Sequence, residues 1–277
     1  MAVGGGYPVA PTTSSPSAPI NPMQLQHGGL SAAVKYLARA AATASYGDIT
    51  KAVKQTKVAN GFVVSISQPW PITAVFVDQK TGAWVGLPLG FAVNTFERQT
   101  SNGSLLFLTQ GPMGDGTYSP FPAQELCSPQ PDGAFKCQQG PAYFPITAQN
   151  VRFGSKPNEA LTTVIATSQG LKFVFGHLQY ADYLSIPPTT VEYNATDKTL
   201  AIDFSDTTLD GVSGLPALQS QYIESVSVAS SGQDAVVTVH LTPAAAYYTG
   251  SINVPAGPTA FLEIDFATTP PAPPWGP

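Results

Sequence analysis

The feature that most constrains the fold of this chain is a series of short apolar runs, each bounded by turn-forming residues. Runs of this length that are flanked by Gly, Pro, Asn and Asp are typical of β-strands. In one of them, Val237, Val239 and Leu241 alternate with Thr238 and His240, as expected for an antiparallel strand with one buried face. The runs that we expect to be strands are Phe62–Ser67, Ile72–Asp78, Phe91–Gln99, Ser104–Thr109, Thr162–Thr167, Leu171–His177, Leu200–Phe204, Tyr222–Ala229, Ala235–Leu241 and Phe261–Phe266.

The composition supports the same fold class. The 277 residues include 25 Gly and 27 Pro, and only 10% of them are charged, whereas about 25% are charged in an average soluble domain. This content of Gly and Pro favours many short strands joined by turns over a helical fold. We therefore predict an all-β protein of two tandem β-sandwich or jelly-roll-like units, with a short N-terminal helical element and extended Pro-rich arms.

Both ends of the chain are rich in proline. Residues 1–34 contain no Asp, Glu, Lys or Arg, and prolines recur throughout residues 8–22. A segment of this composition cannot form a core by itself. We expect extended arms at residues 1–29 and 268–277, and we expect residues 1–25 of the first arm to cross onto a neighbouring subunit instead of folding back on their own chain.

Residues 30–58 are predicted to be a helical element. Leu30, Val34 and Leu37 recur at the spacing of one helix face. Gly47 interrupts the pattern, and a second short helix would follow it. The remaining boundaries that we predict are a first β unit with a long Cys-containing loop at 59–150 and a second β-sandwich unit at 151–267.

The basic residues of the N-terminal part of the chain gather around this helical element. They form either a small anion-facing patch or the solvated face of a helical segment, and the sequence leaves both readings open. The net charge of −5 argues against a specific duplex-DNA reader, since such proteins are usually basic. The basic residues concerned are Lys35, Arg39, Lys51, Lys54 and Lys57.

Asn102-Gly103 is the strongest short-range hairpin signal in the chain. It lies between the predicted strands Phe91–Gln99 and Ser104–Thr109. Both residues tolerate the positive φ that a type I′ turn requires at its two central positions. We therefore expect a tight turn at Asn102-Gly103 that joins two antiparallel strands.

Residues 110–149 contain seven prolines and both cysteines, without a clear apolar run. A connection of this length is usually functional, so we predict an assembly loop there. Its aromatic residues would hold a neighbouring subunit, or else they would cover the core of their own domain. These residues are Tyr118, Phe121, Phe135, Tyr143 and Phe144.

Cys127 and Cys137 are predicted to form a disulfide. Asp132-Gly133 lies midway between them and is a turn signal that would bring the two cysteines together. We expect their Cα atoms to lie within about 7 Å of each other, as a bridge requires. A bridge would imply an oxidising environment at some stage of the protein's life, and the alternative is two free thiols.

The second β region carries a resemblance to a known family. The strand Leu171–His177 is followed by Leu200–Phe204, Ile223–Val228, Val236–Leu241 and a closing strand at Leu262–Phe266. In this order and spacing, residues 171–266 resemble the AMIN domain, a small β-sandwich of bacterial envelope proteins. The resemblance implies an extracytoplasmic location and association with peptidoglycan.

The sequence offers no constellation for catalysis. His27, His177 and His240 stand far apart, and no Gly-x-Ser-x-Gly motif places a nucleophile. The acidic residues of 203–210 lack the EF-hand pattern and fit turn hydrogen bonding. We therefore expect no enzymatic activity, no cofactor and no metal site.

The ends of the chain and the lengths of its apolar runs bear on its location. No run reaches the length of a transmembrane helix, so we expect no transmembrane segment. The first residues lack the basic and apolar regions of a signal peptide. We expect a chain that is assembled without secretion, or a mature form that carries a new Met.

These features together predict a non-enzymatic structural subunit of a large assembly, namely a phage or virus virion protein such as a capsid, decoration or tail component. Its partners would be copies of itself, as a homo-oligomer, and other structural subunits, but no sequence-specific nucleic acid. The alternative is an extracytoplasmic cell-envelope protein that binds peptidoglycan through an AMIN-like C-terminal domain, or a cell-surface filament subunit. The location would be the virion in the first case, and the cell envelope or the extracellular space in the second.

Overall fold

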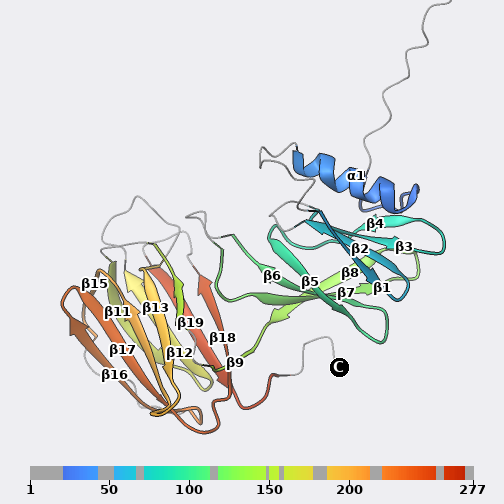
Figure 1. Ribbon diagram of the computed structural model, residues 1–277. Helices are drawn as coiled ribbons and strands as arrows, with labels where there is room; N and C mark the ends of the chain where they lie inside the picture. The colour runs from blue at the N-terminus through green and yellow to red at the C-terminus, as the bar shows by residue number, and fades with distance from the viewer. Residues whose placement is uncertain are drawn as a thin grey trace, which may run out of the picture.

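The computed structural model describes residues 21–42, 53–66, 72–112, 118–147, 150–155, 159–176, 186–212, 220–253 and 259–271. Among these residues there is one α-helix, and nearly all other regular structure is antiparallel β-sheet. The strands form four sheets that are grouped in two units side by side (Figure 1). The predicted all-β class with a short N-terminal helix is therefore confirmed. Within the described ranges, no helix is both long enough and apolar enough to cross a membrane.

The first unit has three layers. Strands β1–β4 form one four-stranded sheet and β5–β8 form another, and each strand pairs with the next one along the chain. Helix α1 covers one face of the β1–β4 sheet, and the β5–β8 sheet packs against the other face (Figure 1). The elements are α1 (Gly29–Ala42), β1 (Val53–Val58), β2 (Gly61–Ile66), β3 (Ala74–Asp78), β4 (Trp84–Gly86), β5 (Val93–Gln99), β6 (Leu105–Gln110), β7 (Ala123–Pro129) and β8 (Phe135–Pro141).

The middle position of the β1–β4 sheet explains the sequence of β2. Val64 and Ile66 are buried on the side of the sheet that faces α1, whereas Val63 is buried on the side that faces Leu105 and Phe107. A strand that is buried on both faces has a nearly continuous apolar sequence instead of an alternating one. The predicted strand at 62–67 is confirmed as β2.

The prediction of helix at residues 30–58 is wrong for the C-terminal part of that range. Residues 53–58 are the edge strand β1, in which Val53 packs toward the helix and Val58 packs toward the β5–β8 sheet. The residues between these two valines, including Lys54 and Lys57, are polar or charged. The sequence therefore lacks the apolar alternation by which a strand is recognised. Residues 43–52, where a second short helix is expected, lie outside the described residues.

The last part of the predicted N-terminal arm folds back on its own chain. Gln26 exchanges backbone hydrogen bonds with Trp84 of β4, at N–O distances of 2.7 and 2.8 Å, and Gly86 donates its N–H to the Pro22 carbonyl. The prediction that residues 1–25 cross onto another subunit is therefore wrong for residues 21–25, because the open edge of β4 lies next to them. Residues 1–20 lie outside the described residues.

The hairpin between β5 and β6 is present, but its turn differs from the predicted type. The Gly103 N–H donates to the Thr100 carbonyl and the Thr100 N–H donates to the Ser104 carbonyl, so the loop has three residues. Gly103 has a φ of 87°, whereas Asn102 does not have a positive φ. A type I turn followed by one left-handed glycine needs only that single special residue. The turn is therefore not type I′.

The second unit is a sandwich of two sheets around one apolar core. Its sheet orders are β10-β13-β14-β17-β16 and β15-β11-β12-β19-β18-β9, and β15 pairs with β11 in parallel. Because Phe144 and Pro145 pair with β18, this unit begins before residue 151. The strands are β9 (Phe144–Pro145), β10 (Asn150–Phe153), β11 (Glu159–Ala166), β12 (Gly170–Gly176), β13 (Thr189–Asn194), β14 (Thr199–Phe204), β15 (Thr207–Leu209), β16 (Ile223–Ser231), β17 (Asp234–Leu241), β18 (Tyr247–Asn253) and β19 (Thr259–Ala267).

Candidate functional site

Phe121 joins the two units. It precedes β7 of the first unit, yet its side chain is buried in the core of the second unit. Its ring makes edge contacts with Phe153 and Tyr248, at centroid distances of 5.3 and 6.5 Å. A Cβ atom added at Gly250 of β18 would lie 2.6 Å from the Phe121 ring, so the glycine makes room for the ring. Phe121 is therefore a buried contact between the first unit and the second.

A groove of about 390 Å³ lies beside Phe121, between the two units. Ligand sites occur preferentially at domain interfaces, so this groove is a candidate binding site. Its lining offers hydroxyl groups, one amide side chain and apolar surface, but no acidic, basic, histidine or cysteine side chain. The lining residues are Ser119, Phe121, Pro122, Ala123, Gln139, Gly140, Pro141, Thr249, Gly250, Ser251 and Ile252.

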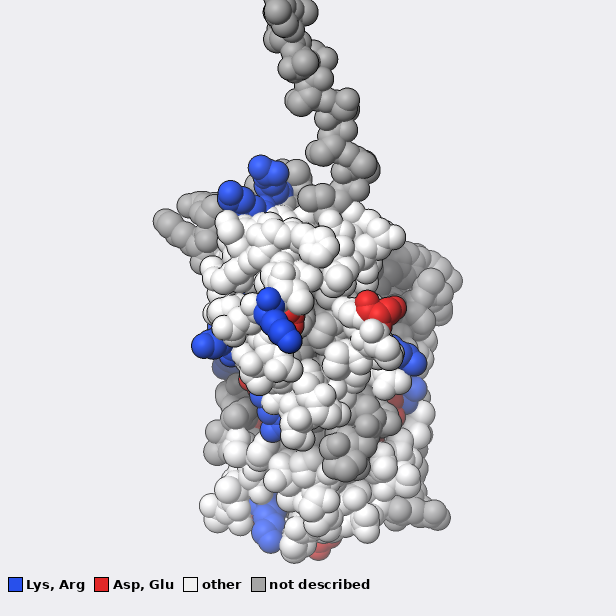
Figure 2. Space-filling model, turned by 90° about the vertical axis from the view of Figure 1, so that its right-hand side faces the viewer, with Lys and Arg blue, Asp and Glu red and all other residues white. Residues whose placement is uncertain are grey.

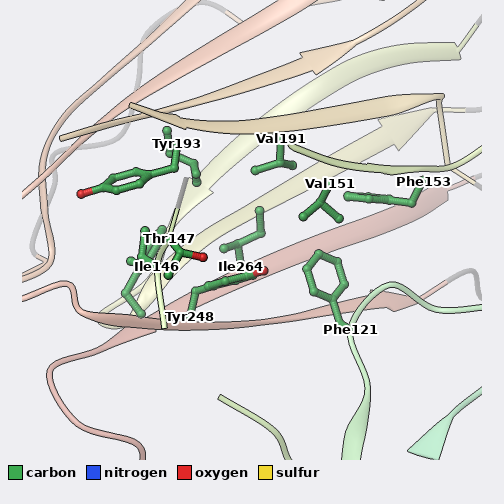
Figure 3. A pocket seen from close by; sticks show the side chains of 11 residues that line it. Phe121, Ile146, Thr147, Val151, Phe153, Val191, Tyr193, Tyr248 and Ile264 are labelled. Carbon is green, nitrogen blue, oxygen red and sulfur yellow. The ribbon is translucent and has the colours of Figure 1, made fainter. Parts of the chain in front are cut away.

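A small apolar cavity of about 20 Å³ lies behind Phe121, inside the second sandwich. Figure 3 shows side chains of both sheets converging on it, with the Tyr193 hydroxyl directed away from Phe121 and Val151. Burial raises the pKa of Tyr248, which also lines the cavity. A space of this size holds at most about one water molecule, so the cavity is part of the core and not a ligand site.

A second groove, of about 360 Å³, lies at the turn end of the first unit, and we call it the turn groove. Phe76 and Phe135 form its aromatic wall, with ring centroids 5.3 Å apart, and Leu25 of the N-terminal segment stands at its rim. Four of the hairpin turns of the unit, β1–β2, β3–β4, β5–β6 and β7–β8, and strand β4 supply most of the rest. Its lining residues are Leu25, Asn60, Phe76, Asp78, Thr81, Ala83, Trp84, Val85, Gln99, Asn102, Gly103, Pro129, Gly133 and Phe135.

Asp78 is the single charged residue in the lining of the turn groove. Its carboxylate accepts hydrogen bonds from the Thr81 backbone N–H at 2.7 Å and from the Thr81 hydroxyl at 2.6 Å. These bonds lower the pKa of Asp78. The carboxylate therefore holds the β3–β4 turn in place, and the groove as a whole is suited to an uncharged, partly apolar ligand.

Glu125 belongs to a buried polar network between the sheets of the first unit. Asn94 donates its amide N–H to Thr73 Oγ1, and Thr109 Oγ1 lies 2.8 Å from Asn94 Oδ1 and 3.4 Å from Glu125 Oε2. Burial raises the pKa of Glu125, against smaller opposing effects of the Gly90 backbone N–H and the Thr109 hydroxyl. No sequence pattern predicts this network, because its members come from four separate segments.

The predicted basic patch is divided in the structure. Lys35 and Arg39 are exposed on α1, whereas Lys54 and Lys57 are exposed on β1, where alternation directs them to opposite faces of the sheet. Figure 2 shows the basic side chains scattered over this side of the molecule. Lys51 lies outside the described residues. The four described residues therefore do not form one anion-facing surface.

The predicted assembly loop is instead the β7–β8 hairpin and the segment that leads to β9, and four of its five aromatic residues are at least partly buried. Phe121 is in the second core, Phe135 packs on Phe76, and Phe144 packs near Tyr248. Tyr143 is half-buried, and burial, then Asp265 and Tyr222, raise its pKa. Tyr118 is 40% exposed. The prediction of an aromatic contact surface is wrong for Phe121, Phe135, Tyr143 and Phe144, because these four side chains are at least partly buried within the protein itself.

Cys127 and Cys137 are joined by a disulfide across the β7–β8 hairpin. They are directly opposite each other in the register of the two strands, and their Cα atoms are 3.9 Å apart. Gly133, with a φ of 84°, forms the turn between them, as the Asp132-Gly133 signal predicted. The bridge holds the edge strand β8 to the rest of its sheet.

The described histidines, His27 and His240, and the acidic segment 203–210 do not come together as a site. His27 accepts a hydrogen bond at its backbone carbonyl from the Trp84 indole N–H, and His240 is exposed on β17. Asp206 donates its backbone N–H to Asp234, at 2.9 Å. In the described part of the chain, no group of three or more His, Cys, Asp or Glu side chains is placed to hold a metal ion. His177 lies outside it.

Comparison with protein-family models, with curated proteins and with solved structures finds no match to this chain. The resemblance of residues 171–266 to the AMIN domain therefore has no family match behind it. The structure also shows that these residues are only part of the second sandwich, since β10 and β11 lie before residue 171 and contribute to both of its sheets.

Proposed function

We propose that this protein is a non-enzymatic structural subunit of a large assembly, such as a capsid, decoration or tail component of a phage or virus. The observation that carries the proposal is the junction at Phe121, where a side chain of the first unit is buried in the core of the second. A subunit that must repeat the same contacts many times needs a constant arrangement of its units, and such a junction favours one. In this proposal the partners are copies of the chain and other structural subunits, and the location is the virion.

The side chains that line the two grooves support a binding role over a catalytic one. The groove at the junction has no titratable side chain in its lining, and the carboxylate in the turn groove is used to hold its own turn. General acid–base or nucleophilic catalysis needs at least one such group within reach of a substrate. The hydroxyl, amide and apolar groups that are present can form contacts with another protein.

The proposal is tested by measuring the mass of the species that the native chain forms in solution. Sedimentation velocity and light scattering of the full chain, over a wide range of concentrations, should show self-association, and electron microscopy should show a regular particle when its partner proteins are added. A chain that stays monomeric at every concentration, and that adds to no particle, contradicts the proposal.

The disulfide favours a second candidate, an extracytoplasmic cell-envelope or cell-surface protein. Disulfides persist in oxidising compartments and are rare in reducing ones, and Cys127–Cys137 is such a bond. Co-sedimentation with purified peptidoglycan tests this candidate. Retention of the chain in the pellet would support it, and loss of the chain to the supernatant would count against it.

A further inference from the structure

The edges of the four sheets are not equally protected. An open edge strand can pair with another chain, and proteins block this with lysines, prolines, bulges or short strands. The edge strand β1 carries exposed Lys54 and Lys57, and β8 carries Lys136 and Pro141. The edge of β4 is covered by the segment that contains Gln26.

The remaining edges follow the same rule, with one exception. Strand β5 has a bulge and two exposed charged residues, β10 contains Arg152, and β15 and β9 are only three and two residues long. Strand β16 is nine residues long, and from Ser225 to Ser231 it consists of Ser, Val and Ala. Its bulge lies at one end, between Ile223 and Ser225. In the described part of the chain, β16 is therefore the long edge whose protective features, this bulge and the exposed charge of Glu224, are confined to one end.

The register of β16 on β17 shows which backbone groups face the open side. A two-residue turn joins Ser231 to Asp234, and the pair that flanks such a turn is hydrogen-bonded. Hydrogen bonding alternates along an antiparallel pair, so Ser227 and Ala229 also bond to β17. The Leu241 N–H donates to Lys198 on the opposite side, which agrees with this alternation. The N–H and C=O groups of Val226, Val228 and Ser230 therefore point away from the sheet.

We propose that β16 pairs with β16 of a second copy of this chain, antiparallel and about a two-fold axis at Val228. This pairing joins the two five-stranded sheets into one continuous sheet. It rests on the proposed function and names the contact by which copies associate.

The sequence of β16 is self-complementary in this register. Val228 would lie opposite Val228 of the second copy, and Val226 opposite Ser230, so that each outward-facing backbone group finds a partner. On the other face, Ser227 would lie opposite Ala229. The single charged residue of the strand, Glu224, would lie opposite Gly232, so no like charges meet. Val228 is half-buried in the monomer, and the pairing would cover more of it.

The test compares Ser230→Pro with Ser230→Thr in the full chain. Proline removes an N–H that faces the open edge, not one that bonds to β17, and edge strands tolerate proline at such positions. Threonine keeps the N–H and is the matched control. In sedimentation equilibrium, S230P should raise the dissociation constant of the dimer at least about tenfold, whereas S230T should leave it unchanged. Equal association of S230P and the wild type overturns the proposal.

Hydrogen exchange of the wild type keeps the test decisive if S230P fails to fold. The amides of Val226, Val228 and Ser230 should be protected at high protein concentration and should exchange rapidly on dilution. Rapid exchange at every concentration, in a sample that is associated, overturns the pairing but leaves the proposed function standing. A wild-type chain that is monomeric throughout overturns the pairing, and it overturns the proposed function as well if the chain also adds to no particle.

A double variant tests the register. With the axis at Val228, Ser227→Cys and Ala229→Cys in one chain would face each other across the contact, in a pair without backbone hydrogen bonds, whose Cα atoms lie about 4.5 Å apart. Mild oxidation should then produce a covalent dimer on a non-reducing gel. Its absence from a sample that is dimeric in solution overturns this register.

Discussion

The two units are both β-sandwiches, but they are stabilised in different ways. The first unit has two separate buried clusters, one on each side of the β1–β4 sheet, together with a disulfide and a buried polar network. The second unit has one large apolar cluster and, in its described residues, no disulfide. That cluster includes Phe121, which belongs to the first unit. The second core is therefore incomplete without the first unit, whereas the reverse dependence is much weaker.

The largest expected effect comes from removing this shared side chain. Phe121→Ala should destabilise the second unit by about 3–5 kcal/mol, because it removes a buried aromatic ring and leaves a cavity. Hydrogen exchange during urea unfolding should show that the amides of β12 and β19 lose protection, whereas the protection of β2 should change little. Tyr118→Ala, at an exposed position of the same segment, is the control and should be close to neutral. Equal losses in both units would contradict the one-sided dependence.

Removing the disulfide should destabilise the first unit and leave the second unit unchanged, the opposite of what we expect for Phe121→Ala. Replacing both Cys127 and Cys137 with Ala should destabilise the first unit by about 2–3 kcal/mol, the stabilisation that the chain-entropy account gives a loop of this length. Exchange should rise in β7 and β8, and the amides of β12 should stay as protected as in the wild type. A matching loss in the second unit would show that the two units unfold as one.

Gly250→Ala tests how closely the two units fit together. Its Cβ would lie 2.6 Å from the Phe121 ring, so the ring or the strand must move, at a cost of about 1–3 kcal/mol. In the Phe121→Ala background the same substitution should cost almost nothing, because the ring is gone. A double-mutant cycle by urea unfolding measures the difference. Additive effects would mean that the contact does not join the units.

The smallest expected effect concerns pH and the Glu125 network. The Thr109 hydroxyl lies within hydrogen-bond distance of Asn94 Oδ1 and of Glu125 Oε2, and its contact with the carboxylate opposes the effect of burial on the pKa of Glu125. Burial raises the pKa of Glu125 above its unfolded value. Its contribution to stability is therefore full below the unfolded pKa and is lost as pH rises through the folded pKa.

Glu125→Gln keeps an uncharged side chain at this buried position at every pH. The first unit of this variant should therefore lose less stability than the wild type between pH 4 and pH 8, as measured by urea unfolding. Asp203→Asn is the matched variant in the second unit, where burial, then Asp234 and Glu192, raise the pKa of Asp203. In each variant, the free energy of unfolding of the unit that carries the substitution should vary less with pH than in the wild type. A response in the wrong unit would contradict the assignment.

The sequence predicted the strands that have regular patterns. Alternating runs such as β17 and continuous runs such as β2 were identified from their periodicity, and the Asp132-Gly133 turn predicted the pairing of the two cysteines. Strand β1 was missed, because lysines on an edge strand give it the appearance of a solvated helix. Strands β7 and β8 were missed because prolines and polar residues are tolerated in them.

The candidate surfaces were harder to predict, because they depend on contacts between distant segments. Phe121 and Gly250 meet only in the folded chain, although an isolated glycine within a strand pattern is a known sign of a close approach. The turn groove is lined by residues from four hairpin turns and by Leu25, which come together only in the folded chain. The open edge of β16 becomes visible only when the strand order of its sheet is known.

The connectivity of the two units also sets an order of events during synthesis. Every sheet of the first unit joins neighbours in sequence, so this unit can fold soon after residue 141 leaves the ribosome. The second unit must wait, because β12 pairs with β19, near the C-terminus. Until β18 and β19 are made, Phe121 protrudes from a finished first unit, exposed to water and available to a chaperone, and the arrival of Gly250 covers it.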